Sequence, residues 1–129
     1  MTDEAPQKRK EHFQMSTYSV YGSGFDKVGE VTDSGNVYDR SNSKVGEVSS
    51  SGTVYGGTFK EKVGEVKSSG NIYGKSNDGY FTQKVGEASS NGNIYGKSYG
   101  SSFTNKIGEV KGTSNVYLIG AAGLLLLIR

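Results

Sequence analysis

Apolar residues recur along this chain in short groups with a fixed internal spacing. A Lys-(Val or Ile)-Gly-Glu sequence begins at Lys27, Lys44, Lys62, Lys84 and Lys106, and a (Val or Ile)-Tyr pair follows at a constant distance. The connector back to the next Lys varies, because it holds five residues, then six, then ten and ten again. Register errors move side chains to the wrong face of a sheet, whereas extra loop residues cost little free energy. The pattern therefore indicates a repeated structural unit with tolerant loops.

Each copy predicts two short strands joined by a tight turn. Val, Ile, Tyr and Phe occur in runs of four to six residues between Ser, Gly, Asn and Asp clusters. A tripeptide such as Ser68-Ser69-Gly70 ends in a Gly that supplies the positive φ of a three-residue reversal. The fifth copy has Gly112-Thr113-Ser114 instead, so we expect its turn to differ.

Two apolar positions within a copy, such as Val63 and Val66, lie three residues apart. Strict alternation would place them on opposite faces of a strand. A bulge or tight bend at Gly64 would return both valines to one side. The alternative is that Gly64 only lets a neighbouring side chain lie close.

Two all-β architectures fit these copies. In a tandem-repeat β-solenoid, with about two short strands per repeat, identical residues stack from coil to coil. In an antiparallel meander of β-hairpins, the apolar face meets water unless the sheet rolls into a barrel or meets a partner. We predict the solenoid and keep the meander as the alternative.

The chain divides into three parts. Residues 1–15 carry charge without periodicity, hold Pro6 and His12, and predict a disordered N-terminal arm. Residues 16–117 form the β-repeat array, which opens on a half-copy, Ser19-Val20-Tyr21-Gly22, expected at its N-terminal edge. Residues 118–129 form an apolar C-terminal segment.

This C-terminal segment has two interpretations. The apolar run from Val116 to Ile128 holds 13 residues, fewer than the roughly 20 that a membrane-spanning helix needs. It is either an apolar plug or last strand that covers the array, or an attachment surface for another subunit, an assembly partner or a membrane. The residues of this assembly surface would be Leu118, Ile119, Leu124, Leu125, Leu126, Leu127 and Ile128.

Alternation also assigns the aromatic residues. The phenylalanines at 25, 59, 81 and 103 are expected in the core with the Val and Ile residues, and the tyrosines are expected in an outer stripe. Regularly spaced rings can stack against sugar rings, which makes this stripe the best candidate for ligand binding. The alternative is that Tyr simply favours strands. The candidate ligand-binding residues are Tyr38, Tyr55, Tyr73, Tyr95 and Tyr117.

Composition limits the function classes. With 33% apolar residues and 20 Gly in 129 residues, one copy cannot hold itself together, but stacked copies can. The net charge of +2 provides no general attraction for nucleic acid, and the absence of Cys excludes disulfides and thiolate metal sites. No apolar stretch follows Lys8-Arg9-Lys10, so no signal peptide is expected and the default localisation is cytoplasmic.

Catalytic and metal constellations are not apparent. His12 is the only histidine, so no Ser-His-Asp set can form, and a Glu repeated identically in every copy is typical of a scaffold. A calcium site around Asp33, Asn36, Asn77 and Asp78 is conceivable, although turn chemistry explains these residues better. We therefore predict a protein that is not an enzyme and needs no cofactor or metal.

The Val-Gly-Glu-Val…Ser-Gly-Asn-Ile-Tyr-Gly repeat, with the apolar tail from Gly120 to Arg129, resembles bacterial short-tandem-repeat β proteins over residues 19–129. The resemblance implies no activity or functional residues. The repeat also looks broadly like membrane-occupation-and-recognition hairpins, whose Tyr-x-Gly and Gly-x-Gly spacing it does not reproduce.

The sequence thus predicts a structural, self-assembling β-repeat protein that forms homo-oligomers or filaments through strand edges and its apolar C-terminus. The alternatives are a module whose Tyr/Lys stripe binds a polysaccharide or protein, and a membrane-attached protein that uses residues 118–129.

Overall fold

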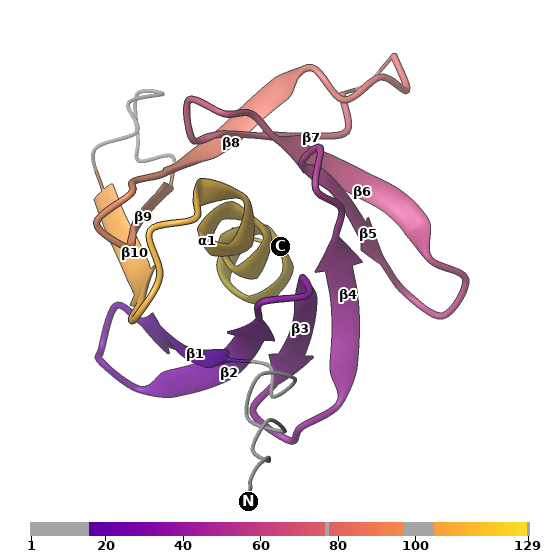
Figure 1. Ribbon diagram of the computed structural model, residues 1–129. Helices are drawn as coiled ribbons and strands as arrows, with labels where there is room; N and C mark the ends of the chain where they lie inside the picture. Colours follow the sequence, from indigo (N-terminus) through magenta and orange to yellow (C-terminus); the bar gives the residue numbers. More distant parts are fainter. Residues whose placement is uncertain (1–15, 77, 97–104, 129) are drawn as a thin grey trace, which may run out of the picture.

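The computed structural model describes residues 16–76, 78–96 and 105–128 and forms a closed antiparallel barrel around a C-terminal helix (Figure 1). The strands are β1 (Thr17–Gly22), β2 (Lys27–Thr32), β3 (Asn36–Asp39), β4 (Lys44–Val48), β5 (Thr53–Gly56), β6 (Glu61–Val66), β7 (Asn71–Gly74), β8 (Gln83–Ala88), β9 (Asn93–Gly96) and β10 (Asn105–Val110). The predictions for residues 1–15, including His12, and for Asn77 and Phe103 lie outside the described residues.

The all-β prediction is confirmed, but the solenoid is wrong. Every strand pairs antiparallel with its neighbours in sequence, and β1 pairs with β10 to close the barrel. Three-residue turns can join only antiparallel neighbours, whereas stacked coils need parallel pairing and longer crossovers. Closure also turns the apolar face of the meander inward, where the C-terminal helix covers it.

The N-terminal half-copy closes the barrel instead of forming the predicted edge. In β1, Val20 pairs with Val110 and Tyr21 pairs with Glu109, which are the partners that a second strand of copy five would have. The N-terminal half-copy therefore completes the fifth repeat. With β10 paired on both sides, no strand partner remains for Val116 and Tyr117.

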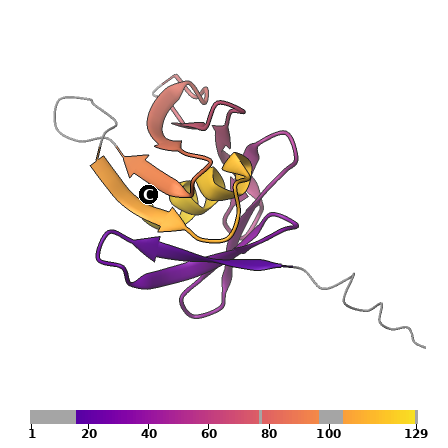
Figure 2. The same ribbon diagram turned by 60° about the vertical axis from the view of Figure 1, so that its left-hand side comes forward.

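These residues begin a helix instead. Helix α1 (Val116–Ala122) continues directly into a π-helix, η2 (Gly123–Ile128), and both lie inside the barrel (Figure 2). Asn115 caps α1, because its side-chain oxygen accepts hydrogen bonds from the backbone N–H of Tyr117 at 2.9 Å and Leu118 at 3.4 Å. The apolar C-terminal segment is thus a plug, and it fills the interior rather than covering one end.

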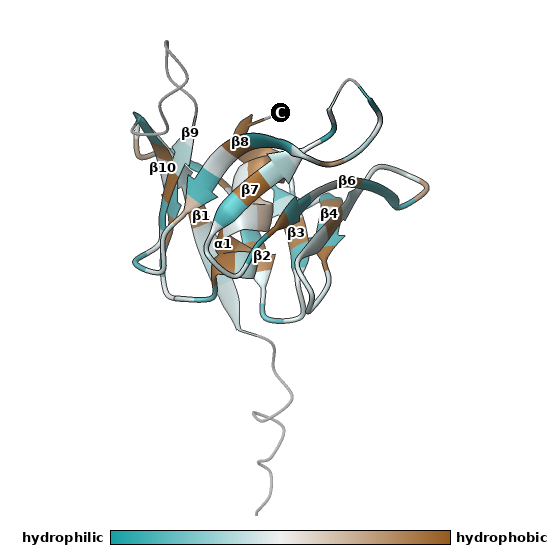
Figure 3. Cartoon of the chain, turned by 90° about the horizontal axis from the view of Figure 1, so that it is seen from above, coloured by the Kyte–Doolittle hydropathy of each residue, from teal (hydrophilic) through white to brown (hydrophobic). Residues whose placement is uncertain are grey.

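The core lies between the helix and the inner wall. The inner wall includes Val31 and Val37 of the first copy and their equivalents, while Ile119, Ala121 and Ala122 of α1 are fully buried. Side chains alternate inward and outward along each strand, so apolar and polar segments alternate in Figure 3. Gly120 and Gly123 pack against Val66 and Ile94, where a Cβ atom would have no room.

A β-bulge occurs in every copy. Val37 pairs with Gly46 and Tyr38 pairs with Lys44, so Val45 is the extra residue in β4. Register shifts recur at the equivalent places beside β2, β6, β8 and β10. The predicted bulge is confirmed, and it lies one residue before the Gly. It brings Val45 beside Val48 against the core, whereas Val63 of the third copy stays 36% exposed although Val66 is buried.

The repeat glycines make room for the π-helix. A Cβ atom on each would lie closer than 3.0 Å to a side chain of η2. The pairs are Gly64 with Leu124, Gly46 with Leu125, Gly29 with Leu126, Gly108 with Leu127 and Gly86 with Ile128. Five consecutive residues therefore face five consecutive copies around the barrel. A π-helix, with i to i+5 hydrogen bonds, has more residues per turn than an α-helix. This brings the number of side chains per turn closer to the five copies that surround it.

The prediction that phenylalanines belong to the core is wrong for the residues described. Phe25 is 77% exposed and Phe59 is 83% exposed, while Phe81 is half-buried on the outer surface. Phe25 stands two residues before the repeat Lys that follows it, whereas Phe59 stands three residues before its own. Both lie in the hairpin loops, where no alternation applies.

Candidate functional site

The two ends of the barrel differ. We call the end where the chain enters α1 the base; it carries the turns at 33–35, 50–52, 68–70 and 90–92. The other end, where η2 terminates, we call the mouth. It carries the hairpin loops at 23–26, 40–43 and 57–60, and the described residues 75–76 and 78–82 of the connector between β7 and β8.

Apolar side chains line the mouth. Leu126, Leu127 and Ile128 are half-buried, and the bulge residue of each copy lies beside η2. One hollow of about 440 Å³ is lined by Val45, Val63, Leu124 and Leu125, among others. The bulge residues are Val28, Val45, Val63, Val85 and Ile107.

Two exposed phenylalanines lie in the mouth loops. Phe25 lies in the loop between β1 and β2, and Phe59 lies in the loop between β5 and β6. Water contact with two whole aromatic rings is unfavourable, and such residues often mark protein or membrane contact sites. The apolar mouth is therefore the strongest candidate for an interaction surface.

Backbone strain is also concentrated in the mouth loops. Among the described residues, Phe25, Asn42 and Lys60 are the non-glycine residues with positive φ, at 68°, 69° and 53°. Each of the three lies in a mouth hairpin, two residues before the repeat Lys. Asn tolerates this conformation, but a bulky side chain such as Phe disfavours it. Strain of this kind is found preferentially at functional sites.

The charges of the mouth loops are mixed. Arg40 and Lys75 form no ion pair within the described part of the chain, and Lys60 pairs with Glu47 at 3.3 Å. Asp26 and Glu61 lie in or beside the same loops. No single sign dominates, so contact at the mouth depends on apolar area rather than on charge.

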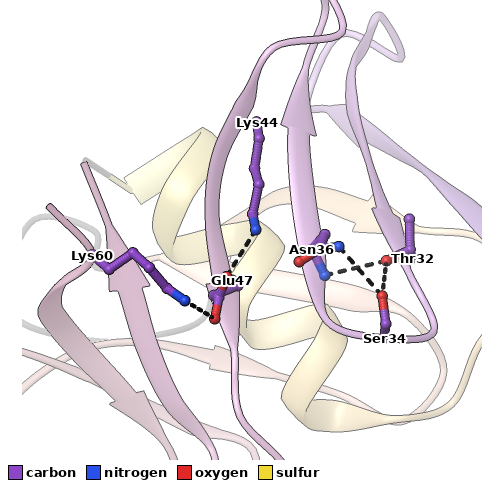
Figure 4. Close-up of polar contacts among 6 residues, drawn as sticks. All are labelled: Thr32, Ser34, Asn36, Lys44, Glu47 and Lys60. Carbon is purple, nitrogen blue, oxygen red and sulfur yellow. Dashed lines mark hydrogen bonds and ion pairs between the residues drawn. The ribbon is translucent and has the colours of Figure 1, made fainter. Parts of the chain in front are cut away.

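The outer wall carries a belt of Tyr, Lys and Glu. Tyr73 lies between Glu65 and Lys84 on its neighbouring strands, and every copy repeats this arrangement. Each repeat Lys also pairs with the Glu three residues later, as Lys44 does with Glu47 at 2.8 Å, and Lys60 approaches the same carboxylate (Figure 4). The belt tyrosines are Tyr21, Tyr38, Tyr55, Tyr73 and Tyr95.

Four of the five tyrosines predicted for the outer stripe lie on the outer wall, and the fifth does not. Tyr38, Tyr55, Tyr73 and Tyr95 occupy the belt, whereas Tyr117 lies in α1, near Gly52 at the base. Tyr21 takes the fifth position. The belt rings are half-buried between the charged neighbours, as expected for a scaffold.

Paired lysines perturb the belt carboxylates. Hydrogen bonds from Lys62 and Lys67 lower the pKa of Glu65 below its ordinary value of 4.5. The pKa of Glu47 is lowered by Lys44 and Lys60, and that of Glu109 by Lys106 and Lys111. These groups stay ionised at neutral pH, so none has the raised pKa of a general acid.

Metal binding gains no support from the described residues, which contain no group of three or more His, Cys, Asp or Glu side chains that could hold an ion. Two of the residues considered for calcium have other partners: Asp33 accepts a hydrogen bond from the Tyr18 hydroxyl at 2.6 Å, and Asp78 accepts one from the Tyr80 backbone N–H at 3.0 Å. Within the same residues, no polar side chain is buried.

The predicted assembly residues fall into two groups. Leu118, Ile119, Leu124 and Leu125 are buried inside their own barrel and cannot contact a partner while the barrel is folded. Leu126, Leu127 and Ile128 remain partly exposed at the mouth. No helix in the described ranges is long and apolar enough to cross a membrane.

Comparison with known proteins finds no family model, curated protein or solved structure that matches this chain. The resemblance to bacterial short-tandem-repeat proteins therefore stays an expectation.

Proposed function

We propose that this protein is a non-catalytic attachment protein whose apolar mouth binds the interfacial region of a lipid bilayer. The observation that carries the proposal is the exposure of Phe25 and Phe59 on the same end as Leu126, Leu127 and Ile128. Aromatic and aliphatic side chains on a protein surface favour the boundary between lipid headgroups and acyl chains.

The arrangement of the mouth loops favours a lipid bilayer over a second copy of the chain as the binding partner. The phenylalanines are on separate loops around the end of η2, so a rigid partner would have to match every loop at once. A bilayer surface adapts to such scattered contacts. Two barrels joined mouth to mouth would also form a closed pair, not a filament, because that contact is used up on both sides.

The filament hypothesis from the sequence loses its main support. Each strand of the described barrel has a partner on both sides, so edge-to-edge addition has no exposed edge to use. What remains of the original hypothesis is association through the apolar C-terminal surface, and the experiment below separates it from lipid attachment.

The test is co-flotation of the 129-residue chain with phosphatidylcholine vesicles, with and without phosphatidylglycerol. We expect the protein to float with both, since the mouth has no dominant charge, and we expect the Phe25→Ser/Phe59→Ser double variant to stay behind. Ser68→Ala, at the base, is the matched control and should float like the unchanged protein. Circular dichroism should show the same fold for all three.

Two results would contradict the proposal. One is equal flotation of the double variant, and the other is no flotation of the unchanged protein. Sedimentation without lipid adds a further discrimination: a dimer that the double variant abolishes would assign the mouth to a second copy instead.

A further inference from the structure

Copy three departs from the repeat in two places, and both lie on the outer wall. The residue after the second apolar position of the first strand is Lys67, where copies one, two and four have Thr or Ser. The connector after Tyr73 is one of the two long ones and carries Tyr80 and Phe81. A repeated scaffold needs neither change, so their coincidence points to a local role.

The long connector folds back onto the belt. Ser76 organises it: its N–H donates to the Tyr80 carbonyl at 2.6 Å, and its hydroxyl hydrogen-bonds to the Thr82 hydroxyl at 2.7 Å. The Lys62 amino nitrogen lies 4.5 Å from the centroid of the Phe81 ring. The neighbouring Tyr80 is 68% exposed. The loop is held by its own hydrogen bonds while it presents an aromatic ring to solvent.

Together these residues form a groove of about 420 Å³. Tyr73, Tyr80 and Phe81 supply three rings, while Lys62, Lys67 and Glu65 supply the charge. The Lys67 amino group is 2.8 Å from a Glu65 carboxylate oxygen and 6.0 Å from the Tyr73 ring. Two amino groups around one carboxylate leave a net charge of +1.

We propose that this groove binds one ring of an acidic saccharide, stacked on Tyr80 with its carboxylate beside Lys62 and Lys67. Aromatic faces pack against the C–H face of a sugar ring, and the positive charge complements one carboxylate. An acidic peptide fits less well, because an extended peptide usually adds to an exposed strand edge, and the described barrel presents none.

The chain contains its own control. Lys111 pairs with Glu109 at 3.1 Å and lies 5.8 Å from the Tyr21 ring, which reproduces the Lys67, Glu65 and Tyr73 arrangement. The connector after Tyr21 is short, so this second set has no loop aromatics over it. If charge and a single ring were sufficient, both places would bind the same ligand.

The test is a titration with trigalacturonate followed by NMR chemical shifts, with the trisaccharide's methyl ester as the uncharged control. We expect shifts at Lys62, Lys67, Tyr73, Tyr80 and Phe81, and weaker binding of the ester. Tyr80→Ala should weaken binding by about 2- to 12-fold through lost stacking. Lys67→Gln should weaken it by about 2- to 5-fold, and added salt should act in the same direction.

Lys111→Gln and the Phe25→Ser/Phe59→Ser variant should bind trigalacturonate unchanged, so failure of lipid attachment does not affect this test. The proposal is overturned if shifts at Tyr21 and Lys111 match those at Tyr73 and Lys67. It is also overturned if the methyl ester binds equally, or if the groove does not respond at all.

Discussion

Hairpin turns at the base and at the mouth share one hydrogen bond and one left-handed residue, yet they differ in what occupies that residue. At the base the Gly70 N–H donates to the Lys67 carbonyl at 2.8 Å, and at the mouth the Phe25 N–H donates to the Gly22 carbonyl at 3.0 Å. Base turns use Gly35, Gly52, Gly70 and Gly92 at that residue, while mouth turns use Phe25, Asn42 and Lys60, and use Gly79 in the long connector between β7 and β8.

The surroundings of the turns explain the difference. A Cβ atom on Gly70 would collide with the Ala88 carbonyl, and the other base glycines meet equivalent carbonyls. Nothing lies within 4 Å of the corresponding space at Gly79 in the mouth. The base is therefore packed as part of the fold, whereas the mouth tolerates strained and exposed residues that the fold itself does not require.

The largest difference in stability between the base and the mouth should come from substitutions in the C-terminal helix. Ile119→Ala removes a fully buried side chain near the base and should lower the free energy of unfolding by about 2–5 kcal/mol. Leu127→Ala at the half-exposed mouth should cost about 1–2 kcal/mol. Urea denaturation of both variants measures this difference, and equal losses would show that the mouth is packed as tightly as the base.

A smaller contrast is expected between turn glycines. Gly70→Ala combines left-handed strain with a steric clash and should cost about 2–4 kcal/mol. Gly79→Ala, at the equivalent position of a mouth turn, meets strain alone and should cost about 1 kcal/mol. Thermal unfolding of the pair tests the comparison directly; similar losses would mean that conformation, not packing, fixes the base glycines.

Phe25→Gly should change stability in the opposite direction. Glycine adopts a φ of 68° without a Cβ penalty, so we expect a gain of about 0.5–1 kcal/mol in urea denaturation, together with weaker vesicle binding. Asn42→Gly is the matched control at the equivalent turn, and its gain should be a few tenths of a kcal/mol, roughly, because Asn tolerates this conformation. A loss of stability in Phe25→Gly would indicate that the ring packs on the mouth.

The belt lies between the two ends and should give the smallest effect. The pKa values of Glu47, Glu65 and Glu109 are lowered in the folded state, so their ion pairs stabilise the protein above pH 4.5 and this stabilisation is lost as the pH falls through the folded values. Each contributes within about 1 kcal/mol. Replacing all three with Gln should reduce the loss of unfolding free energy as the pH falls below 4.5. An unchanged pH dependence would refute the stabilising role of these ion pairs.

Local features of the fold could be predicted from the sequence because they depend on neighbouring residues. The Gly at the end of Ser68-Ser69-Gly70 specifies its turn, and the spacing of Val63 and Val66 specifies a bulge. The belt position of Tyr38, Tyr55, Tyr73 and Tyr95 follows from the same alternation. Closure into a barrel could not be deduced in this way, because it depends on pairing between β1 and β10 at opposite ends of the array.

The clearest case of tertiary control is a tripeptide used twice. Asn36-Val37-Tyr38 forms strand β3, whereas Asn115-Val116-Tyr117 caps and begins helix α1. Local propensity is the same in both, so the difference comes from the partners: β1 already occupies the strand position beside β10, and the apolar residues that follow Tyr117 fill the interior. In copies one to four, the repeat alone determined the paired strands, the base turns and the belt tyrosines. The number of copies that close the ring, and the side chains needed to fill it, decided the helix, the mouth and the exposure of Phe25 and Phe59.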